Sequence, residues 1–183
     1  MENLNGLKVG ILVANGFEQI ELEEPRKALE KAGAKTFIIS PEQDKVQGWN
    51  HAEKGDFFSI DYPLDTVESE DFDALLLPGG LMNPDKLRIL PKAVSLVKKI
   101  NQQNKPIAAI CHAPWLLINA GLARGRKMTS YSSVATDLVN AGAEWVDAPV
   151  VRDHQIVTSR KPDDIPQFNE AMINLFANKS GSS

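Results

Sequence analysis

The chain has 183 residues, 43% of them hydrophobic and 24% charged, which is typical of one soluble globular domain. Its net charge of −4 argues against nucleic acid or an anionic membrane as the main partner. No apolar run approaches the roughly 20 residues of a membrane span, and the start MENLNGLK shows no signal peptide. One cysteine excludes an internal disulfide and favours a cytoplasmic protein with a free thiol.

Short apolar runs alternate with amphipathic stretches from the N-terminus onward. Four runs rich in branched residues predict strands buried on both faces of a parallel sheet, at residues 7–14, 34–40, 72–78 and 106–110. The amphipathic stretches predict helices at residues 20–33, 91–103, 114–121 and 133–142. Three of these helices end in Ala-Gly, where a glycine can take the left-handed position after a helix, at Gly33, Gly121 and Gly142. Pro25 marks either the first turn of its helix or a kink.

The C-terminal part of the chain predicts two strands around a polar turn at residues 149–159, then a helix at 165–179. Alternating strands and helices imply right-handed βαβ units and an α/β fold, a mostly parallel sheet with helices on both faces. We therefore expect one domain over residues 1–178 and a disordered tail over 179–183. In such sheets ligands bind beyond the carboxyl ends of the strands, so three unusual strand ends are expected to face one crevice.

The first two strand ends carry carboxylates and glycines. NGFEQIEL holds Glu18 and Glu21, whose spacing puts both on one face of a helix; alternatively they complement the dipole of a helix N-terminus. In PGGLMNPD, Gly79 and Gly80 allow a tight turn that presents N–H groups to a ligand or an oxyanion. This turn lacks the glycine spacing and the Lys-Ser/Thr ending of a phosphate loop.

The third strand end, KPIAAICHAPWLL, holds the only cysteine. A strand-to-helix elbow here would expose Cys111, and the helix N-terminus would lower the pKa of its thiol from about 8.5. The alternative is a small buried hydrophobe in the core. His112 reaches Cys111 only if the elbow is strained; otherwise it serves as base or proton shuttle for the substrate. A neutral Glu21 could donate a hydrogen bond to the thiolate.

The remaining histidines and tryptophans indicate no metal or cofactor site. His51 and His154 are isolated in the sequence, and His154 is expected to be solvated in its turn. Three scattered histidines and one cysteine have no zinc-ligand spacing. Trp115 is either a pocket wall or part of the core, and Trp49 is a further candidate for shaping the pocket.

Several motifs in consistent order resemble the ThiJ/PfpI superfamily, specifically its PfpI-type intracellular protease branch. They run from about residue 8 to 176 and read NGFEQIEL, FDALLLPGG, IAAICHAPWLLINAGLARGRKMTSY, VNAGAEWVD and VTSRKPDD. The resemblance implies a flavodoxin-like three-layer sandwich related to class I glutamine amidotransferases. It also implies a homodimer, with hexamers in some members.

The resemblance assigns roles to individual residues. Cys111 matches the nucleophile and His112 the histidine that follows it. Glu21 matches the glutamate that hydrogen-bonds the cysteine, with Glu18 as its acidic neighbour. Gly80 and the backbone after the cysteine match the oxyanion-binding groups.

Two residues of this chain depart from the family pattern, one at the elbow and one at the position of the third catalytic group. Ala113 stands where the family has glycine, and its methyl group is expected to crowd the elbow. Asp85 stands where the founding protease type has a glutamate that reaches the histidine of a neighbouring subunit. The shorter carboxylate weakens the case for a Cys-His-acid protease triad.

Three functions compete at this point. The resemblance implies a glyoxalase or protein deglycase, in which Cys111 attacks an α-oxoaldehyde or its protein adduct without a cofactor. A cysteine peptidase or amidase would need His112 activated by an acid. A redox sensor or holdase chaperone would use the same exposed thiol without catalysis.

Overall fold

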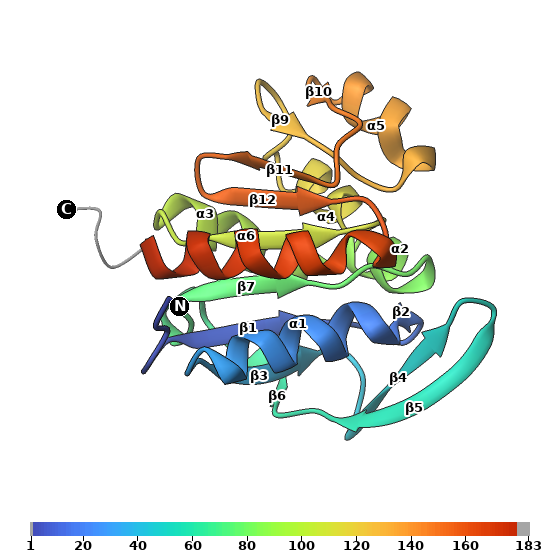
Figure 1. Cartoon of the computed structure of the whole chain (residues 1–183). Helices are drawn as coiled ribbons and strands as arrows, with labels where there is room; N and C mark the ends of the chain where they lie inside the picture. Colours follow the sequence, from blue (N-terminus) through green and yellow to red (C-terminus); the bar gives the residue numbers. More distant parts are fainter. Residues whose placement is uncertain (1, 179–183) are drawn as a thin grey trace.

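A seven-stranded sheet forms the centre of this computed structural model, which describes residues 2–178 (Figure 1). The strand order is β11-β12-β8-β7-β1-β3-β6, and every neighbouring pair is parallel except β11 and β12. The strands are β1 (Lys8–Leu12), β3 (Lys35–Ser40), β6 (Tyr62–Pro63), β7 (Ala74–Leu77), β8 (Ile107–Ile110), β11 (Val150–Asp153) and β12 (Ile156–Ser159).

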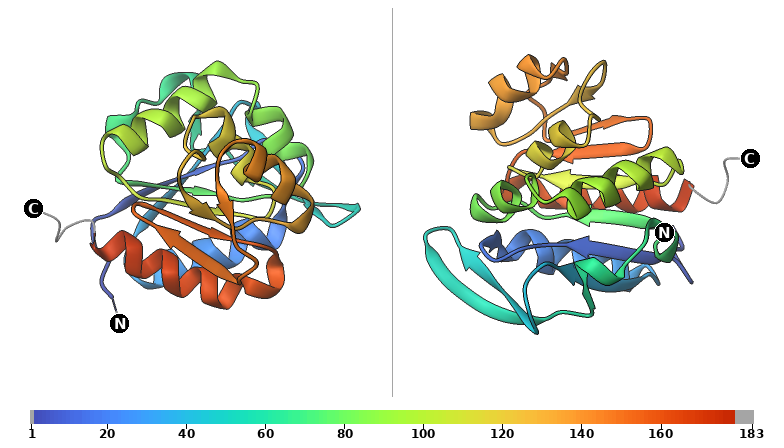
Figure 2. Two further views of the ribbon diagram at one scale, coloured as in Figure 1. Left: turned by 90° about the horizontal axis from the view of Figure 1, so that it is seen from above. Right: turned by 180° about the vertical axis from the view of Figure 1, so that it is seen from behind.

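Helices cover both faces of this sheet (Figure 2). α1 and α6 pack together on one face, and α3 and α4 pack together on the other. The helices are α1 (Gln19–Lys31), α2 (Met82–Leu87), α3 (Pro91–Gln102), α4 (Pro114–Asn119), α5 (Ala135–Asn140) and α6 (Ile165–Asn178), with short 3₁₀ turns η1 (Leu64–Thr66), η2 (Ser69–Asp71), η3 (Ser132–Val134) and η4 (Pro162–Asp164). The predicted flavodoxin-like three-layer sandwich is confirmed.

The strand sequences explain why both faces are covered. In β7, Leu75 and Leu77 belong to the core cluster that includes α3 and α4, whereas Ala74 and Leu76 belong to the cluster that includes α1 and α6. Side chains alternate between the two faces of a strand, so a continuous apolar run must be buried on both. This sheet is therefore the structural support for residues at its carboxyl edge.

The ends of the helices agree with the sequence-based predictions better than their starts do. Gly33, Gly121 and Gly142 have φ values of 103°, 74° and 95°, which confirms the left-handed glycines after three helices. Pro25 does not mark a first turn, because α1 begins six residues earlier and continues past the proline. Packing of the buried face of α1 outweighs the one backbone hydrogen bond that proline removes.

Several elements were not predicted. β4 (Lys45–Asn50) and β5 (Glu53–Ser59) form a long hairpin that extends away from the main sheet, and β2 (Phe17–Glu18) pairs with β4 (Figure 1). β9 (Lys127–Met128) pairs with β10 (Glu144–Trp145). No helix within residues 2–178 is long and apolar enough to cross a membrane. The expected tail, 179–183, lies outside the described residues.

Candidate active site

Three strand ends meet at the carboxyl edge of the central sheet. Because β1, β7 and β8 are neighbours in the sheet, the segments that follow them converge: residues 15–21, Gly79 with Gly80, and Cys111. The chain passes from β1 to β3 on one side and later returns to β7 on the other side of β1. Such a reversal of strand order creates a crevice at which α/β proteins bind ligands.

Cys111 lies on a strained elbow between β8 and α4. Its φ of 66° is in the left-handed region, which is costly for a residue with a side chain. The elbow is fixed on both sides, because the Cys111 N–H donates to Ser159 O at 3.0 Å and its carbonyl accepts from the Tyr131 N–H at 2.9 Å. This strained conformation places His112 Nδ1 3.2 Å from the sulfur of Cys111.

Glu21 lies beneath the elbow with no exposed surface. Its Oε1 accepts the Gly79 N–H at 2.9 Å, whereas its Oε2 is buried without a hydrogen-bond partner. Burial raises the pKa of this carboxyl to about 8, although the Gly79 N–H acts in the opposite direction. Glu21 is therefore an uncharged acid at neutral pH, and it interacts with the thiol of Cys111.

Gly79 is required where it stands because the site is tightly packed around it. A Cβ atom there would lie 2.6 Å from the Ile110 carbonyl oxygen and 2.7 Å from both Cys111 Cβ and Glu21 Oε1. No side chain fits at these distances without displacing the backbone or the acid. The glycine thus lets the strand end of β7 approach the thiol and the carboxyl together.

The environment of the thiol differs from the expectation. Cys111 is only 7% exposed, and burial raises the pKa of its thiol, an effect that a charge on Glu21 would increase. The predictions of an exposed thiol with a lowered pKa are therefore wrong for this chain. α4 has only six residues, and the dipole at its N-terminus does not offset the loss of solvent around the sulfur. The backbone N–H groups of Gly80 and His112 do favour the thiolate.

His112 is held between two aromatic rings. Tyr131 stacks on the imidazole at a centroid distance of 4.8 Å, and Trp115 meets it edge-on at 5.1 Å. Burial lowers the pKa of His112, so its ring is neutral at neutral pH. Nε2 lies 3.3 Å from Ser133 Oγ. If Nε2–H donates to that hydroxyl, Nδ1 is free to accept the thiol proton of Cys111.

Trp115 lies beside His112 and packs against the core. It is half-buried, and the edge of one ring meets the face of the other in its contact with His112. Its Nε1–H donates to Asp137 at 2.9 Å, and the guanidinium of Arg88 lies 5.3 Å from its ring centroid. These contacts fix the tryptophan beside His112.

Glu18 lies at the rim, linked to the β4–β5 hairpin. Its carboxylate accepts the His51 N–H at 3.2 Å, and His51 Nδ1 lies 3.4 Å away. His51 is therefore not isolated, because the hairpin brings it back to the start of α1. No sequence pattern indicates this contact, because the hairpin that makes it is not predicted. Trp49, on the same hairpin, is partly buried.

Asp85 does not complete a triad within one chain. It is exposed on α2, and in the part of the chain that the structure describes no hydrogen bond or ion pair joins it to His112. Its neighbour Asn83, which sequence reasoning missed, is fully buried and holds the glycine turn. The Asn83 amide donates to the carbonyls of Pro78 and Gly79 at 3.0 Å.

Ala113 does not crowd the elbow. Its dihedrals are right-handed, with φ −57° and ψ −30°, so this position does not require glycine. Its methyl group is buried in the core cluster with α3 and α4. Across residues 2–178, no group of three or more His, Cys, Asp or Glu side chains is arranged to hold a metal ion.

Comparisons with known proteins agree with this geometry. A family model described as DJ-1/PfpI matches residues 7–175. A Pyrococcus horikoshii protein named "Deglycase PH1704" is 43% identical over 169 residues, which cover 92% of this chain and 99% of that protein. A Bacillus subtilis protein named "Putative cysteine protease YraA" is 44% identical over 168 residues, covering 92% of this chain and 97% of that one.

A solved structure extends the agreement from the sequence to the fold. Drosophila melanogaster DJ-1beta superposes with a TM-score of 0.84 and 29% identity, covering 95% of this chain and 92% of that one. Together with the family model, these relatives identify the chain. It belongs to the DJ-1/PfpI family, in agreement with the motifs that resemble ThiJ/PfpI proteins.

Proposed function

We propose that this protein is a cysteine-dependent hydrolase that acts on α-oxoaldehydes such as methylglyoxal and on their adducts with protein side chains. The observation that carries the proposal is the elbow, where the Cys111 sulfur lies 3.2 Å from His112 Nδ1 and beside the buried acid Glu21. A relative named as a deglycase, 43% identical over nearly its whole length, supports the same class of substrate.

The first step is addition of the thiol to the aldehyde carbon. The S–C bond forms as His112 Nδ1 takes the thiol proton, so no thiolate has to accumulate in the buried site. This order of events suits a thiol whose pKa is raised by burial and an imidazole that is neutral. The N–H groups of Gly80 and His112 face the reacting region and can stabilise the developing alkoxide.

The later steps need proton transfer, which Glu21 and His112 can supply. Glu21 can protonate the alkoxide, and its carboxylate or the imidazole can move the carbon-bound proton to the neighbouring carbon, which yields a lactoyl thioester. Water then cleaves the thioester and restores the thiol. The sum is methylglyoxal plus water giving lactate. With an amine adduct, thiol attack first releases the amine, and the remaining steps are the same.

The test is lactate production from methylglyoxal and from its adduct with N-acetyllysine. Wild-type protein is compared with Cys111→Ser, whose small change in volume preserves the elbow, and with Ser132→Ala as a control outside the site. The proposal expects lactate from the wild type and the control and none above background from Cys111→Ser. Lactate production that survives Cys111→Ser, in protein whose unfolding curve matches the wild type, would contradict it.

A cysteine peptidase is the second candidate, favoured by the Cys111–His112 contact and by the relative named "Putative cysteine protease YraA". In this alternative a second copy of the chain would bring Asp85 to His112, since one chain alone does not. Hydrolysis of a fluorogenic peptide, lost in Asp85→Asn and dependent on a dimer seen by light scattering, would support it. Full peptidase activity in Asp85→Asn would exclude this form of triad.

A further inference from the structure

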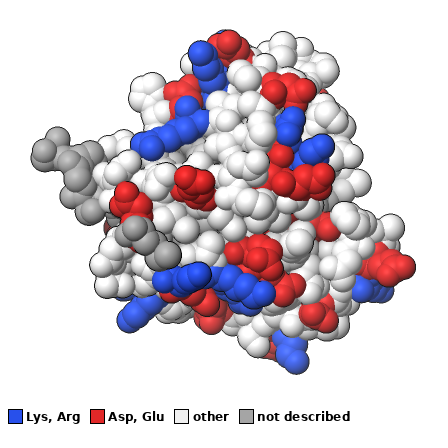
Figure 3. All heavy atoms as spheres, in the orientation of Figure 1, with Lys and Arg blue, Asp and Glu red and all other residues white. Residues whose placement is uncertain are grey.

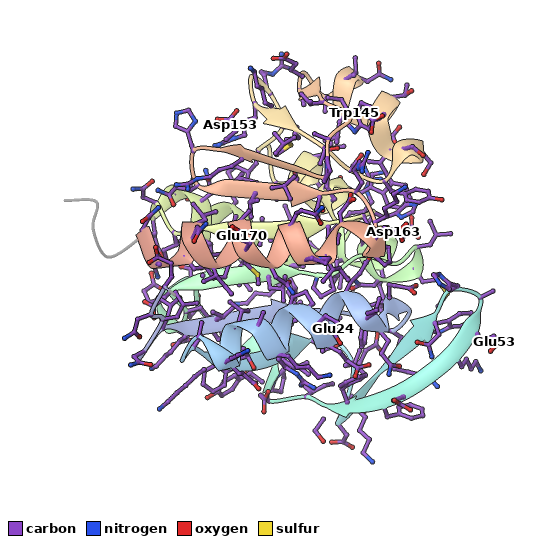
Figure 4. The ribbon with its side chains drawn as sticks, in the orientation of Figure 1. Glu24, Glu53, Trp145, Asp153, Asp163 and Glu170 are labelled. Carbon is purple, nitrogen blue, oxygen red and sulfur yellow. The ribbon has the colours of Figure 1, made fainter. Side chains whose placement is uncertain are left out.

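A strongly polar pocket lies at the opposite end of the sheet from Cys111. It has a volume of about 410 Å³ and is lined by residues from three segments, 101–104, 124–126 and 153–155. The first and third of these segments precede β8 and β12, whereas Cys111 follows β8. Figure 4 places Asp153 at the edge where the parallel strands begin. With four residues in β8, the two sites are separated by about 13 Å or more along the strand.

A tight turn presents two arginines to this pocket. The Arg126 N–H donates to Ala123 O at 3.1 Å, and Gly125, the third residue of the turn, has a φ of 77°. A left-handed third residue is typical of a type II turn, where glycine is favoured. The Gly125 N–H donates to Gly142 O at 2.9 Å, which anchors the turn to the end of α5. Arg124 and Arg126 flank the glycine, and both line the pocket.

The charges in the pocket are unbalanced in favour of cations. The carboxylate of Asp153 is already engaged, since one oxygen accepts the Lys127 N–H at 2.7 Å and the other contacts His154 Nδ1. Arg126 makes a long 3.5 Å contact with Asn101 Oδ1, and its charge helps to lower the pKa of the Asp153 carboxyl. Among the described residues, no ion pair or side-chain hydrogen bond involves Arg124. The two guanidinium groups and the one carboxylate therefore leave the lining with an excess of one positive charge.

Uncharged hydrogen-bonding groups complete the lining. Asn101 and Asn104 lie on one side, and Gln155 on the other. The Oε1 atom of Gln155 is buried without a hydrogen-bond partner, although buried polar atoms normally have one. The pocket thus offers amides as well as charge. Its volume falls in the range of small-molecule sites and exceeds what a single inorganic ion occupies.

We propose that this pocket binds a phosphate group, carried by a small phosphate monoester or present as free phosphate. The two guanidinium groups outnumber the single carboxylate beside them, and each can donate two parallel hydrogen bonds to phosphate oxygens. The amides would contact the hydroxyl groups of an ester. Figure 3 shows acidic and basic side chains mixed over the face that it displays, which does not suit a long polyanion on that face.

The test is a titration of ¹⁵N-labelled protein with inorganic phosphate and with glucose 6-phosphate, followed by NMR against sodium chloride of equal ionic strength. We expect saturable shifts in residues 124–126 and 153–155, with none around Cys111. Tighter binding of glucose 6-phosphate would assign the site to an ester, and tighter binding of phosphate would assign it to the free ion. No saturable shift with either probe would overturn the proposal.

Variants distinguish a specific phosphate site from general attraction of an anion to positive charge. Arg124→Gln combined with Arg126→Gln should weaken binding about tenfold or more, because both forked donors are lost. Arg152→Gln, an exposed arginine next to Asp153 and outside the pocket lining, should change the affinity less than about twofold. Equal effects of the double variant and the control would contradict a specific site. None of these variants touches the Cys111 site, so the result is independent of the proposed hydrolase activity.

Discussion

The floor and the rim of the candidate active site obey different physical constraints. On the floor, Glu21 and Gly79 are buried, and a carboxyl without water becomes an uncharged acid with a pKa of about 8. On the rim, Glu18 accepts the backbone N–H of His51 at 3.2 Å, and Ser133 is exposed. Two carboxylates three residues apart on one chain segment thus have different environments.

Position beneath the elbow, rather than residue type, therefore determines the chemistry that each carboxyl can perform. Glu18 and Glu21 have the same functional group and similar spacing from the sheet edge. Only Glu21 lacks solvent and has an unpartnered oxygen, so only Glu21 is suited to donate a proton. Changes to the floor should therefore have large effects, and changes to the rim should have small ones.

The largest loss of stability at one fixed pH is expected at Gly80. A Cβ atom there would lie 2.5 Å from Gly16 O and 2.6 Å from Glu18 N, and the φ of 82° adds strain. Gly121→Ala is the matched control, since its φ is 74° and nothing lies within 4 Å of the added Cβ. We expect Gly121→Ala to cost about 1 kcal/mol and Gly80→Ala at least about 3 kcal/mol in urea unfolding. Equal losses of unfolding free energy in the two variants would show that the site can accommodate a methyl group at position 80.

Next in size is the effect of Glu21→Gln on turnover of methylglyoxal. Glutamine keeps the shape and the contact with Gly79 but has no proton to transfer, so kcat should fall about 100-fold. Glu18→Gln is the matched change on the rim and should lower kcat less than about tenfold. Steady-state kinetics at neutral pH measures both variants. Similar losses in the two variants would remove the distinction between floor and rim.

The same substitution should change how stability depends on pH. The carboxyl of Glu21 has a pKa of about 8 in the folded protein against an ordinary value of 4.5, so its protonation stabilises the fold below pH 4.5. That stabilisation is lost as the pH rises through 8. From pH 4.5 to pH 8.5 the wild type should therefore lose about 4 kcal/mol more than Glu21→Gln. Urea unfolding at several pH values tests this, and parallel profiles would contradict it.

The smallest effect is expected on the rim at Ser133. Ser133→Ala removes one 3.3 Å contact to His112 Nε2, and the loss of one such hydrogen bond should lower kcat about fivefold. Ser132→Ala, beside it on η3, is the control and should have no effect. A loss as large as that of Glu21→Gln would move Ser133 from the rim into the catalytic machinery.

Much of the fold could be predicted because local signals agree with it. Continuous apolar runs such as β7 are buried on both faces, and glycines such as Gly33 end their helices. The β4–β5 hairpin was missed because much of it is exposed and because a register shift near Gly48 interrupts its alternation. A strand without a regular pattern of burial leaves little trace in the sequence.

The position of the site could be predicted, but its electrostatics could not. Strand ends place Glu21, Gly79 and Cys111 together whatever the side-chain details. The exposure of the thiol depends on distant segments, since Tyr131 and Ser159 hold the elbow. Local sequence suggested a helix dipole acting on an exposed sulfur, whereas the assembled structure surrounds that sulfur with protein. The Ser133 contact likewise joins residues about twenty positions apart with no motif between them.

The central claim is that the floor of the site keeps an uncharged acid next to the thiol. The most direct measurement is a pH titration of the Glu21 carboxyl by NMR of side-chain ¹³C-labelled glutamate, with Glu21→Gln to identify its signal. We expect a midpoint near pH 8, far above the ordinary value of 4.5. A midpoint near 4.5 would mean that Glu21 is charged at neutral pH, and the proposed proton donor would not exist.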